Sequence, residues 1–144
     1  MSGRIFVCLT CDRYAPPISG EPTPGQRLAG AMKSAVASLA SPVMVRTVVC
    51  LNGCPHPCTA ALREPGKCVI RFSELTTEDA TALLDAAMLY SNSADGDIPI
   101  KALPARLQRK VSGRIPAIGR GRLPSTPDHR PLHEAIPVLP GFGP

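Results

Sequence analysis

The sequence has no tryptophan, and only two tyrosines and three phenylalanines occur among its 144 residues. A hydrophobic core must therefore be built from Val, Leu, Ile, Ala and Met side chains. No stretch approaches the roughly 20 apolar residues that a membrane-spanning helix needs, which argues against a membrane protein. The N-terminal segment also lacks the apolar region and the small-residue cleavage site of a signal peptide. These absences predict a cytoplasmic protein.

Proline and charge are unevenly distributed. Residues 1–94 carry eight basic and seven acidic side chains, a net +1, whereas residues 95–144 carry eight basic and four acidic, a net +4. Nine of the 17 prolines lie in this second part, where helical periodicity also ends. The pattern predicts a folded domain over residues 1–96 and a Pro-rich basic tail over 97–144, extended or disordered. The tail lacks interleaved aromatic residues, which argues against nucleic-acid binding.

Apolar periodicity in the first part predicts an alternating order of strands and helices. Strands are expected over 4–9, 43–49, 58–63 and 68–72, and helices over 26–39 and from about 76 to 90. The first strand, helix and second strand should form a parallel right-handed crossover. Pro65-Gly66 should turn the last two strands into a hairpin. The predicted fold is α/β: a thioredoxin-like small mixed sheet of order β-α-β-β-β-α with helices packed on it.

Five of the six cysteines fall into two clusters. Cys8-Leu-Thr-Cys11 is one, and Cys50-Leu-Asn-Gly-Cys54-Pro-His-Pro-Cys58 is the other. Short spacings of this kind let one loop present two thiolates to zinc or to an iron–sulfur cluster. Disulfides are the alternative, but the missing signal peptide favours reduced thiols. The sixth, Cys68, lies alone in an apolar run and is interpreted as a small buried hydrophobe.

Both clusters follow predicted strands. The carboxyl ends of parallel neighbours meet at one edge of a sheet, about 5 Å apart for adjacent strands. Cys8 and Cys11 should therefore converge with Cys50 and Cys54. Four thiolates from two loops suit a [2Fe–2S] cluster or a zinc ion.

A strand ending in cysteine, a later Cys-x3-Cys before a hairpin, and a final helix resemble the thioredoxin-like [2Fe–2S] ferredoxins and the related small subunit of NADH dehydrogenases. The resemblance implies Cys8, Cys11, Cys50 and Cys54 as cluster ligands.

A closer resemblance covers roughly residues 4–118. Its motifs are Val7-Cys-Leu-Thr-Cys-Asp-Arg13, the segment from Cys50 to Lys67, Asp95-Gly-Asp-Ile-Pro99 and Gly113-Arg-Ile-Pro116. They are similar to a family of small bacterial predicted metal-binding proteins, a domain of unknown function often encoded beside cobalamin biosynthesis genes. The family pattern includes Cys58 and not Cys68.

Four further residues are candidates near the metal centre. Cys58 could replace Cys11 or Cys54 as a ligand, stand as a thiol beside the cluster, or face the core. His56 is a candidate ligand, with an exposed loop histidine as the alternative. Arg13 and Lys67 are candidate donors to cluster sulfurs, with two exposed basic residues as the alternative.

The sequence thus favours a cysteine-ligated [2Fe–2S] protein, an electron carrier or accessory that the resemblance ties to cobalamin metabolism. A zinc- or cobalt-binding structural or metal-delivery protein is the second hypothesis, since thiolates bind these metals too. A thiol oxidoreductase using Cys8-Leu-Thr-Cys11 is the third, although a Pro-rich loop follows where such enzymes begin a helix. No phosphate loop or nucleophile elbow is present, so an accessory or carrier is expected rather than an enzyme. A redox or metal-handling protein is the expected partner, and a homodimer is an open alternative.

Overall fold

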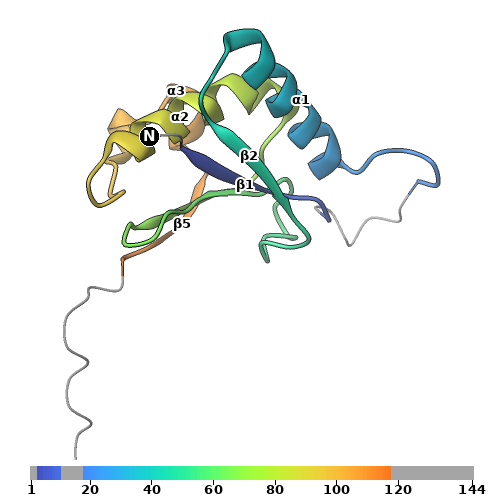
Figure 1. Cartoon of the computed structure of the whole chain (residues 1–144). Helices are drawn as coiled ribbons and strands as arrows, with labels where there is room; N and C mark the ends of the chain where they lie inside the picture. The colour runs from blue at the N-terminus through green and yellow to red at the C-terminus, as the bar shows by residue number, and fades with distance from the viewer. Residues whose placement is uncertain (1–2, 11–17, 118–144) are drawn as a thin grey trace, which may run out of the picture.

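The computed structural model describes residues 3–10 and 18–117 of the chain (Figure 1). Its strands are β1 (Arg4–Cys8), β2 (Met44–Val48), β3 (Ala60–Leu62), β4 (Val69–Phe72) and β5 (Val111–Ile115). Its helices are α1 (Pro24–Leu39), α2 (Ala80–Asn92) and α3 (Ala105–Gln108), with short 3-10 turns η1 (Thr77–Asp79) and η2 (Ile100–Ala102).

The strands form one mixed sheet of order β2-β1-β3-β4-β5. β1 and β2 are parallel, with Cys8 opposite Val48, and α1 makes the crossover between them. β3, β4 and β5 add antiparallel strands on the other side of β1. The predicted parallel crossover, hairpin and β-α-β-β-β-α order are confirmed, and with them the predicted α/β class with a small mixed sheet.

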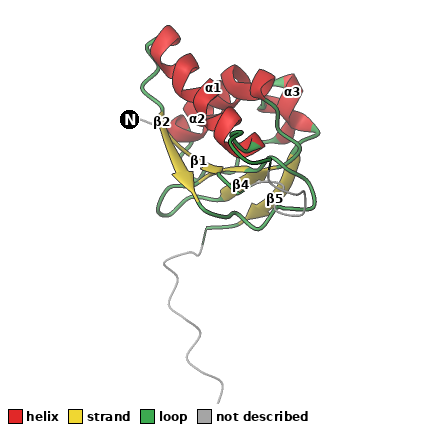
Figure 2. Ribbon diagram, turned by 90° about the vertical axis from the view of Figure 1, so that its right-hand side faces the viewer, coloured by secondary structure: helices red, strands yellow, loops and turns green. Residues whose placement is uncertain are grey.

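The helices lie on one side of the sheet (Figure 2). Alternate strand residues point to opposite faces, and the residues on the helix side form the core with α1 and α2. Ile5 and Val7 of β1 are fully buried there, as are Leu62 of β3 and Ile70 of β4. Tyr90 and Phe72 are the largest fully buried side chains, so both of these aromatic residues serve the core.

A capping box of Thr23 and Gln26 stabilises the first turn of α1. The Thr23 hydroxyl accepts from the Gln26 amide at 3.1 Å, and the Gln26 side chain accepts from the Thr23 amide at 2.8 Å. Pro24 stands at the first helical position, where a missing N–H costs nothing. The helix therefore begins two residues before the predicted start at residue 26.

The predicted boundary at residue 96 is wrong, because residues 97–117 belong to the folded domain. β5 pairs with β4, and Ile98, Leu103 and Leu107 are buried against the helices. The elements are too short to show periodicity: α3 has four residues and η2 three. Residues 118–144, the rest of the predicted tail, lie outside the described residues.

One buried carboxylate fastens this segment to α2. Asp79 accepts from Arg106 Nε at 3.2 Å, from Lys110 Nζ at 2.5 Å and from the Thr76 amide at 2.8 Å. Burial acts to raise the pKa of Asp79, but the hydrogen bonds from Lys110, Thr76 and Arg106 outweigh it and hold the pKa below its ordinary value. The pairing therefore stabilises the packing of α3 on η1 and α2.

Over the described ranges, the longest apolar helical stretch falls short of what a membrane crossing would need.

Candidate cysteine site at the end of the sheet

The two cysteine-bearing segments meet at the carboxyl ends of β1 and β2. The Leu9 amide donates to the Val48 carbonyl at 2.9 Å, and the Thr10 amide donates to the Val49 carbonyl at 3.3 Å. On the other side of β1, the Cys8 amide donates to the Thr59 carbonyl at 3.0 Å. Backbone hydrogen bonds therefore join the surroundings of Cys8, Cys50 and Cys58 into one region.

The loop between Cys50 and Cys58 is folded on itself. The Asn52 amide donates to Cys50 Sγ at 3.2 Å, and Asn52 adopts φ of 56°, a conformation that asparagine tolerates. Gly53 lies directly against the buried Thr59 side chain: a Cβ at this glycine would stand 2.3 Å from Thr59 Oγ1. The loop bearing Cys54 is thus packed against the start of β3.

The start of α1 rests on the backbone of Cys8. A Cβ at Gly25 would lie 2.0 Å from the Cys8 carbonyl oxygen, so only glycine fits this contact. The Thr23 hydroxyl also donates to the Leu9 carbonyl at 2.6 Å. The positive end of the α1 dipole therefore lies beside the end of β1, where negative charge on a ligand is favoured.

The thiols at this end differ in exposure. Cys8, Cys54 and Cys58 are 1%, 6% and 4% exposed, whereas Cys50 is exposed. The Cys8 thiol lies 3.7 Å from the Val49 carbonyl oxygen. Within residues 3–10 and 18–117 the cysteines form no disulfide, and no three His, Cys, Asp or Glu side chains stand close enough together to hold a metal ion.

Cys58 is fixed in the core. Its backbone exchanges hydrogen bonds with Leu75 at 3.4 and 3.1 Å, and its side chain belongs to the same buried apolar cluster as Cys8. Of the three alternatives for Cys58, this placement favours the one in which the thiol faces the core.

His56 is an exposed loop residue. Its imidazole stands 3.4 Å from the Glu74 carboxylate, and its side chain is 67% exposed. Cys11 and Arg13 lie outside the described residues.

Lys67 was a candidate donor to cluster sulfurs, and the structure contradicts this role. β3 runs antiparallel to β1, so the hairpin turn that carries Lys67 lies at the amino end of β1, opposite to Cys8. The length of β1 alone separates the two ends by about 13 Å. The exposed alternative is also wrong, because the Lys67 side chain is only 11% exposed.

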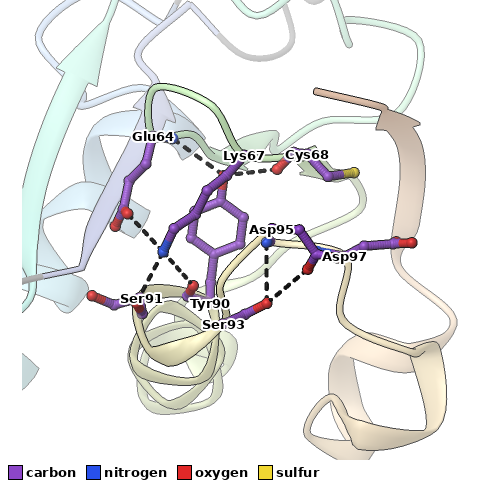
Figure 3. Close-up of polar contacts among 9 residues, drawn as sticks. Glu64, Lys67, Cys68, Tyr90, Ser91, Ser93, Asp95 and Asp97 are labelled. Carbon is purple, nitrogen blue, oxygen red and sulfur yellow. Dashed lines mark hydrogen bonds and ion pairs between the residues drawn. The ribbon is translucent and has the colours of Figure 1, made fainter. Parts of the chain in front are cut away.

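Lys67 instead closes the C-terminal end of α2 (Figure 3). Its Nζ donates to the carbonyls of Tyr90 at 3.0 Å and Ser91 at 2.9 Å, and pairs with Glu64 at 2.8 Å. Helix ends leave such carbonyls without partners, and a cation there also matches the helix dipole. The motif ending in Pro-Gly-Lys67 therefore stabilises the packing of the hairpin against the end of α2. Cys68, next to it, is 5% exposed, as its interpretation as a buried hydrophobe predicted.

Tyr90 joins the hairpin to the loop after α2. Its hydroxyl donates to the Cys68 carbonyl at 2.7 Å and accepts from the Glu64 amide at 3.2 Å. Burial raises the pKa of Tyr90 to about 12, so the phenol stays neutral. Gly96, with φ of +70°, packs against this ring, where a Cβ would lie 2.7 Å from Tyr90 Cε2.

Arg114 connects two motifs that the sequence singled out separately. Its guanidinium donates to the Asp97 carboxylate at 2.6 Å and to the Ile98 carbonyl. Asp95-Gly-Asp-Ile-Pro99 and Gly113-Arg-Ile-Pro116 are therefore one structural unit that holds β5 against the loop after α2. Sequence reasoning missed this pairing because the two motifs lie in different elements.

This geometry defines a small α/β protein with a cysteine-rich loop region at one end of its sheet. Residues 5–117 match the family model described as "Protein of unknown function (DUF1636)". The chain belongs to this family. No curated protein matches the chain.

Among the solved structures similar to the chain are two ferredoxins. One is a thioredoxin-like [2Fe–2S] ferredoxin from Aquifex aeolicus, with 17% identity and a TM-score of 0.49 over 86% of this chain and 96% of that one. The other is the wild-type thioredoxin-like [2Fe–2S] ferredoxin from Aquifex aeolicus, with 17% identity and a TM-score of 0.44 over 71% of this chain and 94% of that one.

Proposed function

We propose that the protein holds a [2Fe–2S] cluster on cysteines at the carboxyl ends of β1 and β2 and acts as an electron carrier or a cluster-bearing accessory. One observation carries the proposal. Parallel pairing of β1 with β2, together with the hydrogen bond from Cys8 to Thr59, gathers four cysteine-bearing positions, at 8, 50, 54 and 58, at one end of the sheet.

The chemistry of the donors fits such a centre. Thiolates are the ligands of [2Fe–2S] clusters, and hydrogen bonds to their sulfurs tune the reduction potential. The Asn52 amide already donates to Cys50 Sγ, a contact of the kind that tunes such a centre. The proposed ligands are Cys8, Cys50, Cys54 and, from the ferredoxin pattern, Cys11. A bound cluster would supply one-electron transfer.

Cluster binding must also draw the ligands together, because the described thiols are not grouped for a metal. Metal binding and folding are commonly coupled in this way, since the ligand loops close only around the metal. The loop from residue 49 to 58 is the segment that would close, because Cys50 is exposed and β3 begins only at Ala60.

A carrier of this kind needs a reducing compartment, so the cytoplasm is its proposed location, and a redox or metal-handling protein is its proposed partner. A link to cobalamin metabolism is part of the same proposal and depends on the family resemblance alone.

A zinc- or cobalt-binding protein is the alternative, because the same thiolates bind these metals. A thiol oxidoreductase is disfavoured by a specific observation. Low thiol pKa values in such enzymes come from a cysteine pair at a helix start, whereas α1 begins only at Pro24, well after Cys11.

Elemental analysis of anaerobically purified protein tests the proposal. We expect iron and acid-labile sulfide in equal amounts, near two of each per chain. Cys50→Ser should lose both, whereas Cys68→Ser should keep both, because Cys68 lies at the other end of the sheet. Stoichiometric zinc or cobalt without sulfide would replace the proposal by the alternative.

A further inference from the structure

The sheet has a second face, which points away from the helices (Figure 2). Strand register places one row of residues across this face: Arg46 of β2, Phe6 of β1, Ala61 of β3, Arg71 of β4 and Gly113 of β5. Phe6 and Arg71 are half-buried and Arg46 is exposed, in contrast to the fully buried Ile5 and Val7 on the helix side.

This face is hollowed. A cavity of about 730 Å³ opens on it, and its apolar lining includes five strand residues: Phe6, Val48, Ala61, Val69 and Ile115. Ile115 is 63% exposed, although it is a large hydrophobic residue. An apolar hollow that crosses several strands and has a polar rim is typical of a binding surface.

The charge on this face is mainly positive. Glu64 also lines the hollow, but its carboxylate pairs with Lys67 at 2.8 Å. Arg63 and Arg71 line the hollow, and strand register puts Arg4 and Arg46 on the same face. Among residues 3–10 and 18–117, no carboxylate forms an ion pair with any of these four arginines. The face therefore offers guanidinium groups that a negatively charged partner could pair with.

The hollow reaches the candidate cysteine site. Leu51, the residue after Cys50, lines it, and the Leu51 carbonyl accepts from Arg71 at 3.5 Å. A molecule bound in the hollow would therefore lie beside the loop that carries Cys50.

We propose that this face docks an acidic protein partner, with apolar side chains in the hollow and carboxylates on Arg46, Arg63 and Arg71. Charge complementarity selects this occupant. A second copy of the chain would bring the same arginines together with like charge. Residues 118–144 carry three arginines and two acidic residues, a net +1, and are not complementary either.

Nucleic acid fits the face less well, because stacking on aromatic side chains usually supports single-strand binding. Among residues 3–10 and 18–117, Phe6 is the one aromatic residue that lines the hollow. Docking at this face would bring a redox partner next to the cysteine loop. That functional consequence rests on the proposed function, whereas the docking itself does not.

A short peptide can test the surface without knowledge of the natural partner. The probe is fluorescein-labelled Glu-Glu-Leu-Leu-Glu-Glu, and the reference is the same peptide with Gln in place of Glu. Fluorescence anisotropy with the full chain should show binding of the acidic peptide, weakening steeply with added salt, and at least about tenfold weaker binding of the reference. Amide shifts in NMR spectra should map to Phe6, Ala61 and Val69.

Two variants distinguish binding at this surface from nonspecific attraction of the acidic peptide to a positively charged protein. The double variant Arg46→Glu, Arg63→Glu should lower affinity for the acidic peptide at least about tenfold. Arg109→Glu is the matched control, because Arg109 is an exposed arginine at the end of α3 and does not line the hollow. It should leave the affinity within about twofold, since charges beyond a Debye length are screened.

Four results would overturn the proposal: no binding of the acidic peptide, equal loss of affinity in Arg109→Glu, tighter binding of a single-stranded oligonucleotide than of the peptide, or a dimer whose formation the double variant abolishes. Metal content of the double variant is measured in parallel. Unchanged metal with lost binding supports docking at this face, and failure of docking in a protein with normal iron and sulfide leaves the proposed function intact.

Discussion

Among single residues, Lys67 tests whether the Pro-Gly-Lys turn stabilises the fold or acts on the metal centre. Lys67→Met removes the cation that pairs with Glu64 and caps the carbonyls of Tyr90 and Ser91. Glu64 would then stay mostly buried without a partner, so the free energy of unfolding should fall by about 2–3 kcal/mol in urea denaturation.

The matched control is Lys33→Met, because Lys33 is an exposed residue on α1 and should change stability by less than about 0.5 kcal/mol. Reduction potential and metal content should be the same in both variants. A shifted potential in Lys67→Met with unchanged stability would mean that this lysine acts on the metal centre after all.

Asp79 gives a prediction with a definite pH dependence. Asp79→Asn should lower the free energy of unfolding by about 2–3 kcal/mol near neutral pH, because it weakens the pairing with Arg106 and Lys110. The pKa of Asp79 is lowered in the folded protein. Its stabilisation is therefore full above the ordinary carboxyl pKa and is lost as the pH falls through the folded-state pKa.

Urea titrations of both proteins from neutral pH down to about pH 3 measure this difference. The difference in free energy of unfolding between wild type and Asp79→Asn should be constant above about pH 4 and should decrease below it. Asp85→Asn is the control, because Asp85 is exposed on α2, and its free energy of unfolding should equal that of wild type. A difference between wild type and Asp79→Asn that increases in acid would contradict the assigned pKa direction.

The choice between Cys11 and Cys58 as fourth ligand can be decided by serine substitutions. We predict that Cys11→Ser loses iron and sulfide, whereas Cys58→Ser retains them. Cys58 faces the apolar core, so its serine variant should instead lose about 1–2 kcal/mol of stability from a buried hydroxyl. Normal iron in Cys11→Ser together with loss in Cys58→Ser would reverse the assignment.

At the scale of elements, α1 is positioned by a contact that only glycine permits. Gly25→Ala would push a Cβ into the Cys8 carbonyl and should cost about 1–3 kcal/mol or more, with reduced metal content. Gly30→Ala is the control in the same helix. A Cβ at Gly30 would have no atom within 4 Å. The substitution should raise the melting temperature, because alanine favours the helix by about 1 kcal/mol relative to glycine. Equal effects of the two substitutions on metal content would show that the contact at Cys8 does not position the site.

Elements with strong local signals were predictable from sequence. The β-branched run of β1, the proline and cap before α1, and the Pro65-Gly66 turn each indicated the observed element. α3 and β5 could not be predicted in the same way, because their stability comes from distant partners. Asp79 binds Arg106 of α3 across more than 25 residues of chain, and β5 pairs with β4 across about 40.

At the scale of the whole molecule, the positions of the cysteine segments follow from topology. The sequence predicted that β1 and β2 would be parallel, and this pairing brings Cys8 and the start of the Cys50 loop together. The same topology could have excluded Lys67 from the site, because a hairpin antiparallel to β1 ends at the opposite edge. The burial of individual thiols depends on packing between loops, such as Gly53 against Thr59, which no local pattern encodes.

The placement of all three helices on one side leaves a molecule with two different faces (Figure 2). One face carries the core and the Asp79 network, and the other carries arginines around an apolar hollow that extends to Leu51. In this arrangement the proposed cluster would lie at the carboxyl ends of β1 and β2, beside the loop from residue 49 to 58.

A reductive titration followed by electron paramagnetic resonance distinguishes a [2Fe–2S] centre from a zinc site. Anaerobically purified full-length protein is reduced stepwise with dithionite, and the spins and the electrons consumed are counted. We predict uptake of close to one electron per chain and a signal from a single unpaired electron, as thiolate-ligated [2Fe–2S] centres give. We also predict loss of that signal in Cys50→Ser and its retention in Cys68→Ser. A protein that takes up no electron and contains one zinc ion per chain would contradict the proposed function.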